Sequence, residues 1–208
     1  MVASTTITAM AHPPVEPARR SRRVARDRAG EAIAAAVHRA PPSAGGTVVV
    51  AIDGRSGAGK TALADELARR HGWPVVRLEL VYPGWDGLAE GVRIVTEEVL
   101  EPLSRGESAS HPVWDWSAGR WGRRRPVRPT PVLVLEGCGS LAPGPTDHVA
   151  VGVWVEAPED VRKERALARD GDVFAPHWAR WARQEEALLR HGHPAGRADL
   201  VVEGDVRA

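Results

Sequence analysis

The chain has 208 residues, 43% of them hydrophobic, which suffices for one domain with a full core but not for two of ordinary size. Its 28 basic and 27 acidic residues leave a net charge of +1, so it lacks the strong basic excess of a dedicated nucleic-acid-binding domain. The single Cys138 excludes an intramolecular disulfide framework and is compatible with a reducing cytoplasm, where we expect the protein. No apolar run approaches the roughly 18 residues of a membrane span.

The first 22 residues are predicted to be a disordered leader. Prolines stand where a signal peptide needs its apolar stretch, and arginines follow the weakly apolar part instead of preceding it. Residues 23–208 are then expected to form a single domain. Apolar residues recur at helical spacing from Val24 to Val37, which predicts an amphipathic helix that stops at the segment PPSAGG, residues 41–46.

Strands and helices alternate through the rest of the chain. Residues 47–53, TVVVAID, are a continuous apolar run rich in β-branched residues, typical of a strand buried on both faces of a parallel sheet. This order of elements predicts a three-layer α/β fold with a mostly parallel five-stranded sheet, in which residues 104–130 are the one long irregular insert. The other predicted strands are 74–80, 131–137, 148–156 and 198–204, and the predicted helices are 60–72, 88–103, 158–170 and 175–192.

The segment between the strand 47–53 and the helix that follows it matches the phosphate-binding P-loop pattern. Its glycines let the backbone turn N–H groups toward an anion, and the helix adds the positive end of its dipole. In this pattern the lysine supplies charge for the β- and γ-phosphates, and the threonine hydroxyl can bind Mg²⁺. ATP or GTP with Mg²⁺ is therefore expected. The predicted nucleotide-binding residues are Gly54, Arg55, Ser56, Gly57, Ala58, Gly59, Lys60 and Thr61.

A second residue on the metal side is predicted at the end of the strand 131–137. Glu136 stands there, at the place where P-loop folds put an acid near the metal ion or its water shell. We therefore expect Thr61 and Glu136 to serve the metal together. A solvated carboxylate at the strand end is the alternative.

The segment VRKERALARD carries Arg162, Arg165 and Arg169 at spacings of three and four, which places them along one helical face. It resembles the lid helix of the uridine kinase and phosphoribulokinase group of P-loop kinases. LVLEG, VWDWSAGR and ADLVVEGD resemble further segments of that group in the same order, over about residues 47–205. The resemblance implies a small-molecule kinase with a lid over residues 158–191, Arg162 near ATP, and Arg165 and Arg169 acting in catalysis.

The resemblance also indicates a general base. The group carries an aspartate followed closely by a tyrosine after its second strand, and the aspartate accepts the proton of the acceptor hydroxyl. This chain reads LELVYPGWDG, with Glu79 at that position and Tyr82 at the expected offset. We predict Glu79 as the base. Asp86 or Asp115 as the base is the second interpretation, and a purely structural Glu79 is the third.

The loops beyond the carboxyl ends of the strands are expected to bind the acceptor. Tryptophans could stack on a flat ring, an aspartate could accept hydrogen bonds from a diol, and an arginine could meet a carbonyl or phosphate. Alternation along HPVWDW places Trp114 and Trp116 on one face of a strand and the aspartate between them on the other. The predicted acceptor-binding residues are Tyr82, Trp85, Asp86, Asp115 and Arg120.

Two features leave alternatives open. Phe174, Trp178 and Trp181 form a helical aromatic stripe that either packs in the core or closes over the acceptor or the adenine. The arginines 123–125 with Trp121 would suit a nucleotide-binding regulator that contacts nucleic acid, which the near-zero net charge disfavours.

We expect a phosphotransferase for a small-molecule hydroxyl, most of all a nucleoside. A nucleoside monophosphate, an antibiotic or another metabolite is the alternative acceptor, no membrane or nucleic-acid partner is expected, and a homo-oligomer is left open.

Overall fold

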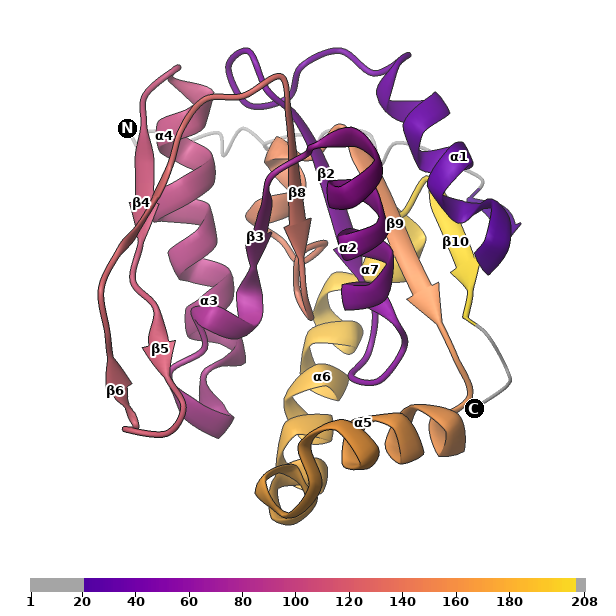
Figure 1. Ribbon diagram of the computed structural model, residues 1–208, viewed down its shortest axis with the longest axis vertical. Coiled ribbons are helices and arrows are strands. Elements are labelled where there is room, and N and C mark those ends of the chain that lie inside the picture. Colours follow the sequence, from indigo (N-terminus) through magenta and orange to yellow (C-terminus); the bar gives the residue numbers. More distant parts are fainter. Residues whose placement is uncertain (1–20, 205–208) are drawn as a thin grey trace, which may run out of the picture.

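A computed structural model describes residues 21–204, so the predicted leader lies outside the described residues except for its last two positions. All pairings in the central sheet are parallel, and the strand order is β1-β10-β9-β2-β8-β3 (Figure 1). The predicted α/β fold is confirmed. The strands are β1 (Arg22–Ala25), β2 (Val48–Asp53), β3 (Val75–Arg77), β8 (Val132–Glu136), β9 (Val151–Glu156) and β10 (Leu200–Glu203).

The sheet has six strands, and the prediction of five was wrong because β1 was assigned to the first helix. That helix, α1, spans Arg26–Val37 and begins after the strand. β10 would otherwise be the edge of the sheet, with backbone groups that need partners. β1 supplies them in register from Arg22 opposite Leu200 to Ala25 opposite Glu203. Only Val24 of this strand is buried. A single apolar residue among polar ones fits both a helix and a short edge strand, so the sequence pattern does not distinguish the two.

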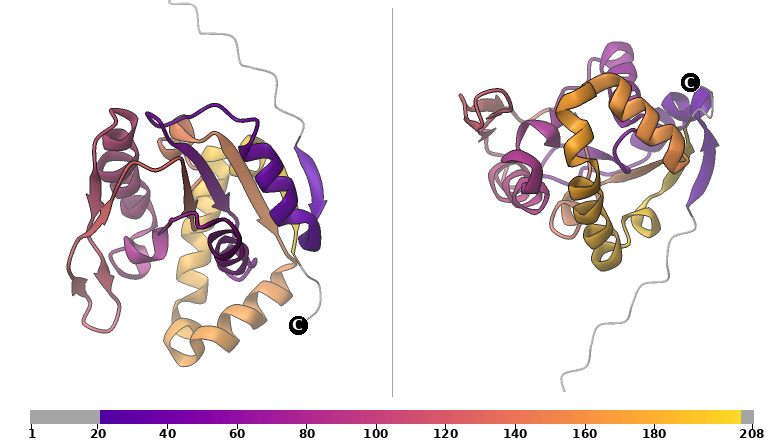
Figure 2. Two further views of the ribbon diagram at one scale, coloured as in Figure 1. Left: turned by 45° about the horizontal axis from the view of Figure 1, so that its top comes forward. Right: turned by 90° about the horizontal axis from the view of Figure 1, so that it is seen from below.

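Helices cover both faces of the sheet (Figures 1 and 2). On one face α1 and α2 pack against inward valines and Ile52 of the central strands. The opposite face is covered by α3 and the helical turns after it, together with α6 and α7. α5 crosses the carboxyl end of the sheet (Figure 1). These helices are α2 (Lys60–His71), α3 (Leu88–Val95), α4 (Glu101–Ser104), α5 (Glu159–Phe174), α6 (Trp178–Gly192) and α7 (Pro194–Arg197), with a π-helical turn at Thr96–Leu100.

The predicted strand 74–80 stops early. β3 ends at Arg77, and Leu78–Leu80 turn into a 3₁₀ helix closed by the Val81 N–H to the Leu78 carbonyl at 2.9 Å. Leu78 is fully buried and anchors this turn. Glu79 therefore projects from the carboxyl end of the sheet and not from within a strand. Further 3₁₀ turns lie at Gly84–Asp86, Pro145–His148 and Ala175–His177.

The prediction that the insert 104–130 is irregular was wrong, because the insert folds into a β-ribbon. Its strands pair antiparallel as β4 (Ala109–His111) with β7 (Arg125–Val127), and as β5 (Trp114–Asp115) with β6 (Arg120–Trp121). The ribbon stands beside α3 and α4 at one edge of the molecule (Figure 1). Among residues 21–204, no helix is long and apolar enough to span a membrane.

Candidate active site

The P-loop connects β2 to α2 at the carboxyl end of the sheet. Gly57 has φ +80°, and a Cβ there would lie 2.0 Å from the carbonyl oxygen of Arg162. Gly54 has φ +146°, and its Cβ would lie 2.4 Å from the carbonyl oxygen of Val155. Both positions require glycine, because L-residues avoid such φ values and backbone fills the space. The loop is thus packed directly on β9 and α5.

Lys60 opens α2 and is 7% exposed. Its Nζ donates to the carbonyl oxygen of Arg55 at 3.1 Å and to Sγ of Cys138 at 3.4 Å. Burial lowers the pKa of Lys60, but neighbouring acidic groups, among them Glu136 and Glu185, outweigh it and leave the pKa raised. Lys60 is therefore a fixed positive charge at the phosphate loop at neutral pH.

The two residues predicted to serve the metal are in contact. Oγ1 of Thr61 donates to Oε1 of Glu136 at 3.2 Å, and Nη1 of Arg77 donates to its Oε2 at 3.3 Å. Glu136 is 3% exposed, and burial raises its pKa. Mg²⁺ is usually held by one or two protein oxygens together with phosphate oxygens and water. A hydroxyl and a carboxylate beside a P-loop lysine fit that requirement.

A cavity of about 780 Å³ opens beyond Lys60 and Thr61. It brings the predicted catalytic and metal residues to one space, although they come from four separate parts of the chain. Aromatic side chains from three other segments form its walls. The predicted site residues that line it are Ser56, Gly57, Gly59, Lys60, Thr61, Glu79, Tyr82, Trp85, Glu136, Arg165 and Arg169.

The three arginines on α5 that were predicted to belong to a lid divide between two spaces. Arg165 and Arg169 line the large cavity, and Arg169 pairs with Asp170 at 2.6 Å. Arg162 is 4% exposed and lies against the P-loop, where its Nη1 donates to the carbonyl oxygen of Ser56 at 3.2 Å. A second cavity of about 540 Å³ lies on that side, lined in part by Arg55, Arg162 and residues after β9.

Three predicted acceptor-binding residues lie outside the large cavity's lining. Asp86 is exposed and pairs with Arg180. Asp115 closes the turn between β5 and β6, where its Oδ1 accepts the N–H groups of Ser117 and Ala118, each at 3.0 Å. Arg120 is exposed on β6, opposite Asp115. One oxygen of the Asp115 carboxylate is therefore engaged within the hairpin, as is usual for an aspartate that stabilises a turn.

The tryptophans of the insert do not share one face as predicted. β5 has only two residues and ends before Trp116, so alternation does not extend to that side chain. Trp114 packs edge-on against Trp121 with ring centroids 5.0 Å apart. Trp116 turns into the large cavity instead, and its Nε1 donates to the carbonyl oxygen of Glu79 at 3.0 Å.

The aromatic stripe belongs to both the core and the cavity. Phe174 and Trp181 are 3% and 5% exposed within the core, and both also line the cavity. Trp85 stacks on Phe174 at 5.1 Å and on His177 at 4.7 Å. The two alternatives for this stripe are therefore not exclusive, since the same rings pack inward and present an apolar wall.

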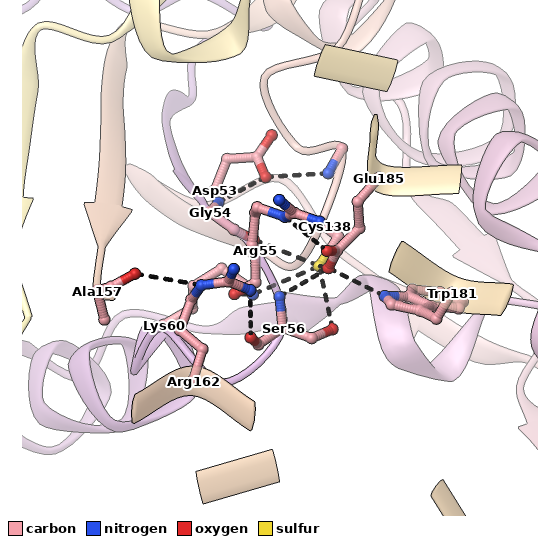
Figure 3. A network of polar contacts seen from close by, with 11 residues as sticks. Asp53, Gly54, Arg55, Ser56, Lys60, Cys138, Ala157, Arg162, Trp181 and Glu185 are labelled. Carbon is pink, nitrogen blue, oxygen red and sulfur yellow. Dashed lines mark hydrogen bonds and ion pairs between the residues drawn. The ribbon is translucent and has the colours of Figure 1, made fainter. Parts of the chain in front are cut away.

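Two buried carboxylates at the site were not singled out in the sequence. Asp53 accepts backbone N–H groups from Gly54 at 2.6 Å, Gly139 at 3.0 Å and Leu141 at 2.8 Å, and burial raises its pKa to about 6. It ties the P-loop to the loop after β8. Glu185 of α6 contacts the P-loop from the other side (Figure 3). The only signal in the sequence that could have identified Glu185 was its position four residues after Trp181, because that spacing places both side chains on one helical face.

No protein-family model matches the chain. Its structure is similar to that of a protein from Bacillus stearothermophilus described as a possible uridine kinase, with a TM-score of 0.63 and 19% identity over 85% of this chain and 98% of the other. A protein from Silicibacter sp. TM1040, described as a candidate fructose transport system kinase, gives a TM-score of 0.58 and 23% identity over 83% and 98%. The chain therefore shares with these two proteins its three-layer α/β fold, in which the P-loop follows β2.

Proposed function

We propose that this protein transfers the γ-phosphate of ATP to a hydroxyl group of a small molecule, most of all a nucleoside. One observation carries the proposal: the large cavity gathers a P-loop lysine, the Thr61–Glu136 pair, Glu79 and two arginines of α5 around one space. These are the groups that phosphoryl transfer needs, because its catalysis rests on positioning and charge stabilisation. GTP is the alternative donor.

Each group has a task in such a reaction. The P-loop N–H groups and Lys60 hold the β- and γ-phosphates, and Thr61 and Glu136 would hold Mg²⁺, which neutralises phosphate charge when bound. The oxygen of the acceptor hydroxyl bonds to the γ-phosphorus, and the bond from the γ-phosphorus to the bridging oxygen of the β-phosphate breaks. Glu79 accepts the proton that the hydroxyl loses. Arg165 and Arg169 stabilise the negative charge on the transferred group.

The two cavities suggest where the substrates lie. The smaller one, beside Arg55 and Arg162, flanks the P-loop and suits the base of the nucleotide. The larger one has walls of Trp85, Trp116 and Trp181, which favour an acceptor that carries a flat ring. The aromatic walls support a nucleoside over a simple sugar.

Acceptor-stimulated ATP consumption tests the proposal. The purified full chain would be assayed with Mg²⁺ and a panel of nucleosides, nucleoside monophosphates, sugars and nucleoside-like antibiotics. We expect one class to stimulate ADP formation, and Lys60→Ala to abolish it. Nucleotide binding without any stimulation would favour a non-catalytic regulator, and equal ADP formation by wild type and Lys60→Ala would refute the phosphotransferase.

A further inference from the structure

A buried carboxylate from helix α6 holds the phosphate loop. Glu185 is 4% exposed and 130 positions distant from Arg55, yet its Oε2 accepts from Nε of Arg55 at 3.0 Å (Figure 3). Its Oε1 accepts the backbone N–H of Ser56 at 2.7 Å and the indole N–H of Trp181 at 3.1 Å. The Sγ of Cys138 also donates to Oε1, at 3.4 Å. Both oxygens are therefore engaged by donors from three elements.

The carboxylate is ionised at neutral pH. Burial raises the pKa of Glu185, but the Ser56 N–H and the charges of Lys60 and Arg55 outweigh burial and leave the pKa below its usual range. A buried carboxylate that loses its partners is costly, so these contacts constrain where the side chain lies. The hydrogen bond from Trp181, one turn earlier on α6, restricts its rotamer further.

Two successive peptide units of the P-loop are oriented from the lid side. The N–H of Ser56 points at Glu185. The carbonyl oxygen of Ser56 accepts from Nη1 of Arg162 at 3.2 Å. In a trans peptide the N–H points opposite to the carbonyl. Arg162 therefore also sets the direction of the next N–H, that of Gly57. Because a P-loop binds anions through the direction of its N–H groups, these two side chains set its geometry.

Glu185 also connects the walls of the two cavities. Arg55, which it pairs with, lines the smaller cavity beside the P-loop. Trp181, which donates to it, lines the larger one. We infer that Glu185 is a positioning residue that holds Arg55 and the Ser56 peptide in the geometry that binds the nucleotide. This inference rests on the proposed function, since it assumes that the loop binds ATP.

ATP affinity of Glu185→Gln tests the inference. Glutamine keeps an oxygen for the Ser56 N–H but removes the charge that holds Arg55. A charge-assisted hydrogen bond contributes enough that its loss should weaken Mg·ATP binding about tenfold. Binding would be measured by calorimetry on the full chain without acceptor. Glu186→Gln is the matched control, because Glu186 is exposed on the same helix and should leave the dissociation constant unchanged.

A double-mutant cycle separates positioning from a general structural role. Arg55→Gln should also weaken ATP binding, and Glu185→Gln should add less than about twofold in that background, since neighbours in one network are not additive. Additive effects, or wild-type affinity in a folded Glu185→Gln variant, would overturn the inference. If Glu185→Gln does not fold, wild-type affinity in Arg55→Gln overturns it equally. Intact ATP binding without acceptor turnover counts against the phosphotransferase alone, whereas a wild type that binds no ATP overturns both.

Discussion

The contact between Gly57 and the first turns of α5 makes Gly57→Ala a stringent test of the P-loop geometry. The added Cβ would lie 2.0 Å from the carbonyl oxygen, 2.7 Å from the carbonyl carbon and 2.9 Å from Cα of Arg162. All three atoms are backbone, so no side chain can rotate away. The residue also has φ +80°, which L-residues adopt only at a cost. Loop and helix must therefore separate by roughly an ångström before the methyl group fits.

The expected loss of stability has two parts. The left-handed backbone costs about 1–2 kcal/mol for a residue with a Cβ. Overpacking against fixed atoms adds about 1–3 kcal/mol. Gly59→Ala carries only the first part, because Gly59 has φ +103° in the same loop but a Cβ there would meet nothing within 4 Å. The difference between the two variants therefore measures the overpacking. Gly57→Ala should therefore be less stable than Gly59→Ala by about 1–3 kcal/mol.

Urea unfolding of the ligand-free variants, followed by circular dichroism, measures this difference directly. Gly57→Ala should in addition lose Mg·ATP binding, since separating the loop from Arg162 releases the Ser56 peptide that Arg162 orients. Equal stability of the two variants would show that the loop does not pack on α5 in this way. The geometry described for the phosphate site would then be wrong.

Three further outcomes are expected. Glu79→Gln should lower acceptor-dependent turnover by about 10²–10⁴-fold with ATP affinity within twofold of wild type; unchanged turnover in steady-state kinetics would exclude Glu79 as the base. The pKa of Asp53 is about 6 in the folded protein and about 4 when unfolded, so the folded state binds the proton more tightly. The free energy of unfolding of wild type relative to Asp53→Asn should therefore fall as the pH rises from 4 to 6 and stay level above pH 7. A difference between the two proteins that does not change with pH would contradict this. Asp115→Ala should speed proteolysis at the β5–β6 turn and leave ATP affinity unchanged, whereas weaker ATP binding would place Asp115 nearer the nucleotide than the hairpin allows.

Much of the P-loop could be predicted from the sequence, because it is local. The eight residues Gly54–Thr61 follow one another, and the glycines shape the backbone of a single turn that also carries the lysine side chain. The buried run of β2 and the carboxylate at the end of β8 are equally readable, since an all-apolar strand has few other structures open to it. The fold class followed from the order of such segments.

Other residues depended on contacts that no short segment contains. The run from Arg22 to Ala25 is a strand only because β10 offers an unpaired edge. Trp116 enters the cavity because β5 ends one residue earlier, which breaks the alternation that the letters HPVWDW indicate. Glu185 is a charged residue on an amphipathic helix, and such residues are usually solvated.

The sequence by itself therefore determined the phosphate loop, the strands beneath it and the arginine-bearing helix, because each depends on the chemistry of near neighbours along the chain. Only the tertiary structure decided which side chains share the large cavity and which hold the loop in place. Asp115 accepts a hydrogen bond from Ala118 within a hairpin turn, whereas Glu185 accepts one from Ser56, which is 129 positions away. The physical reason is that hydrogen-bond partners and burial are assigned by packing between distant segments.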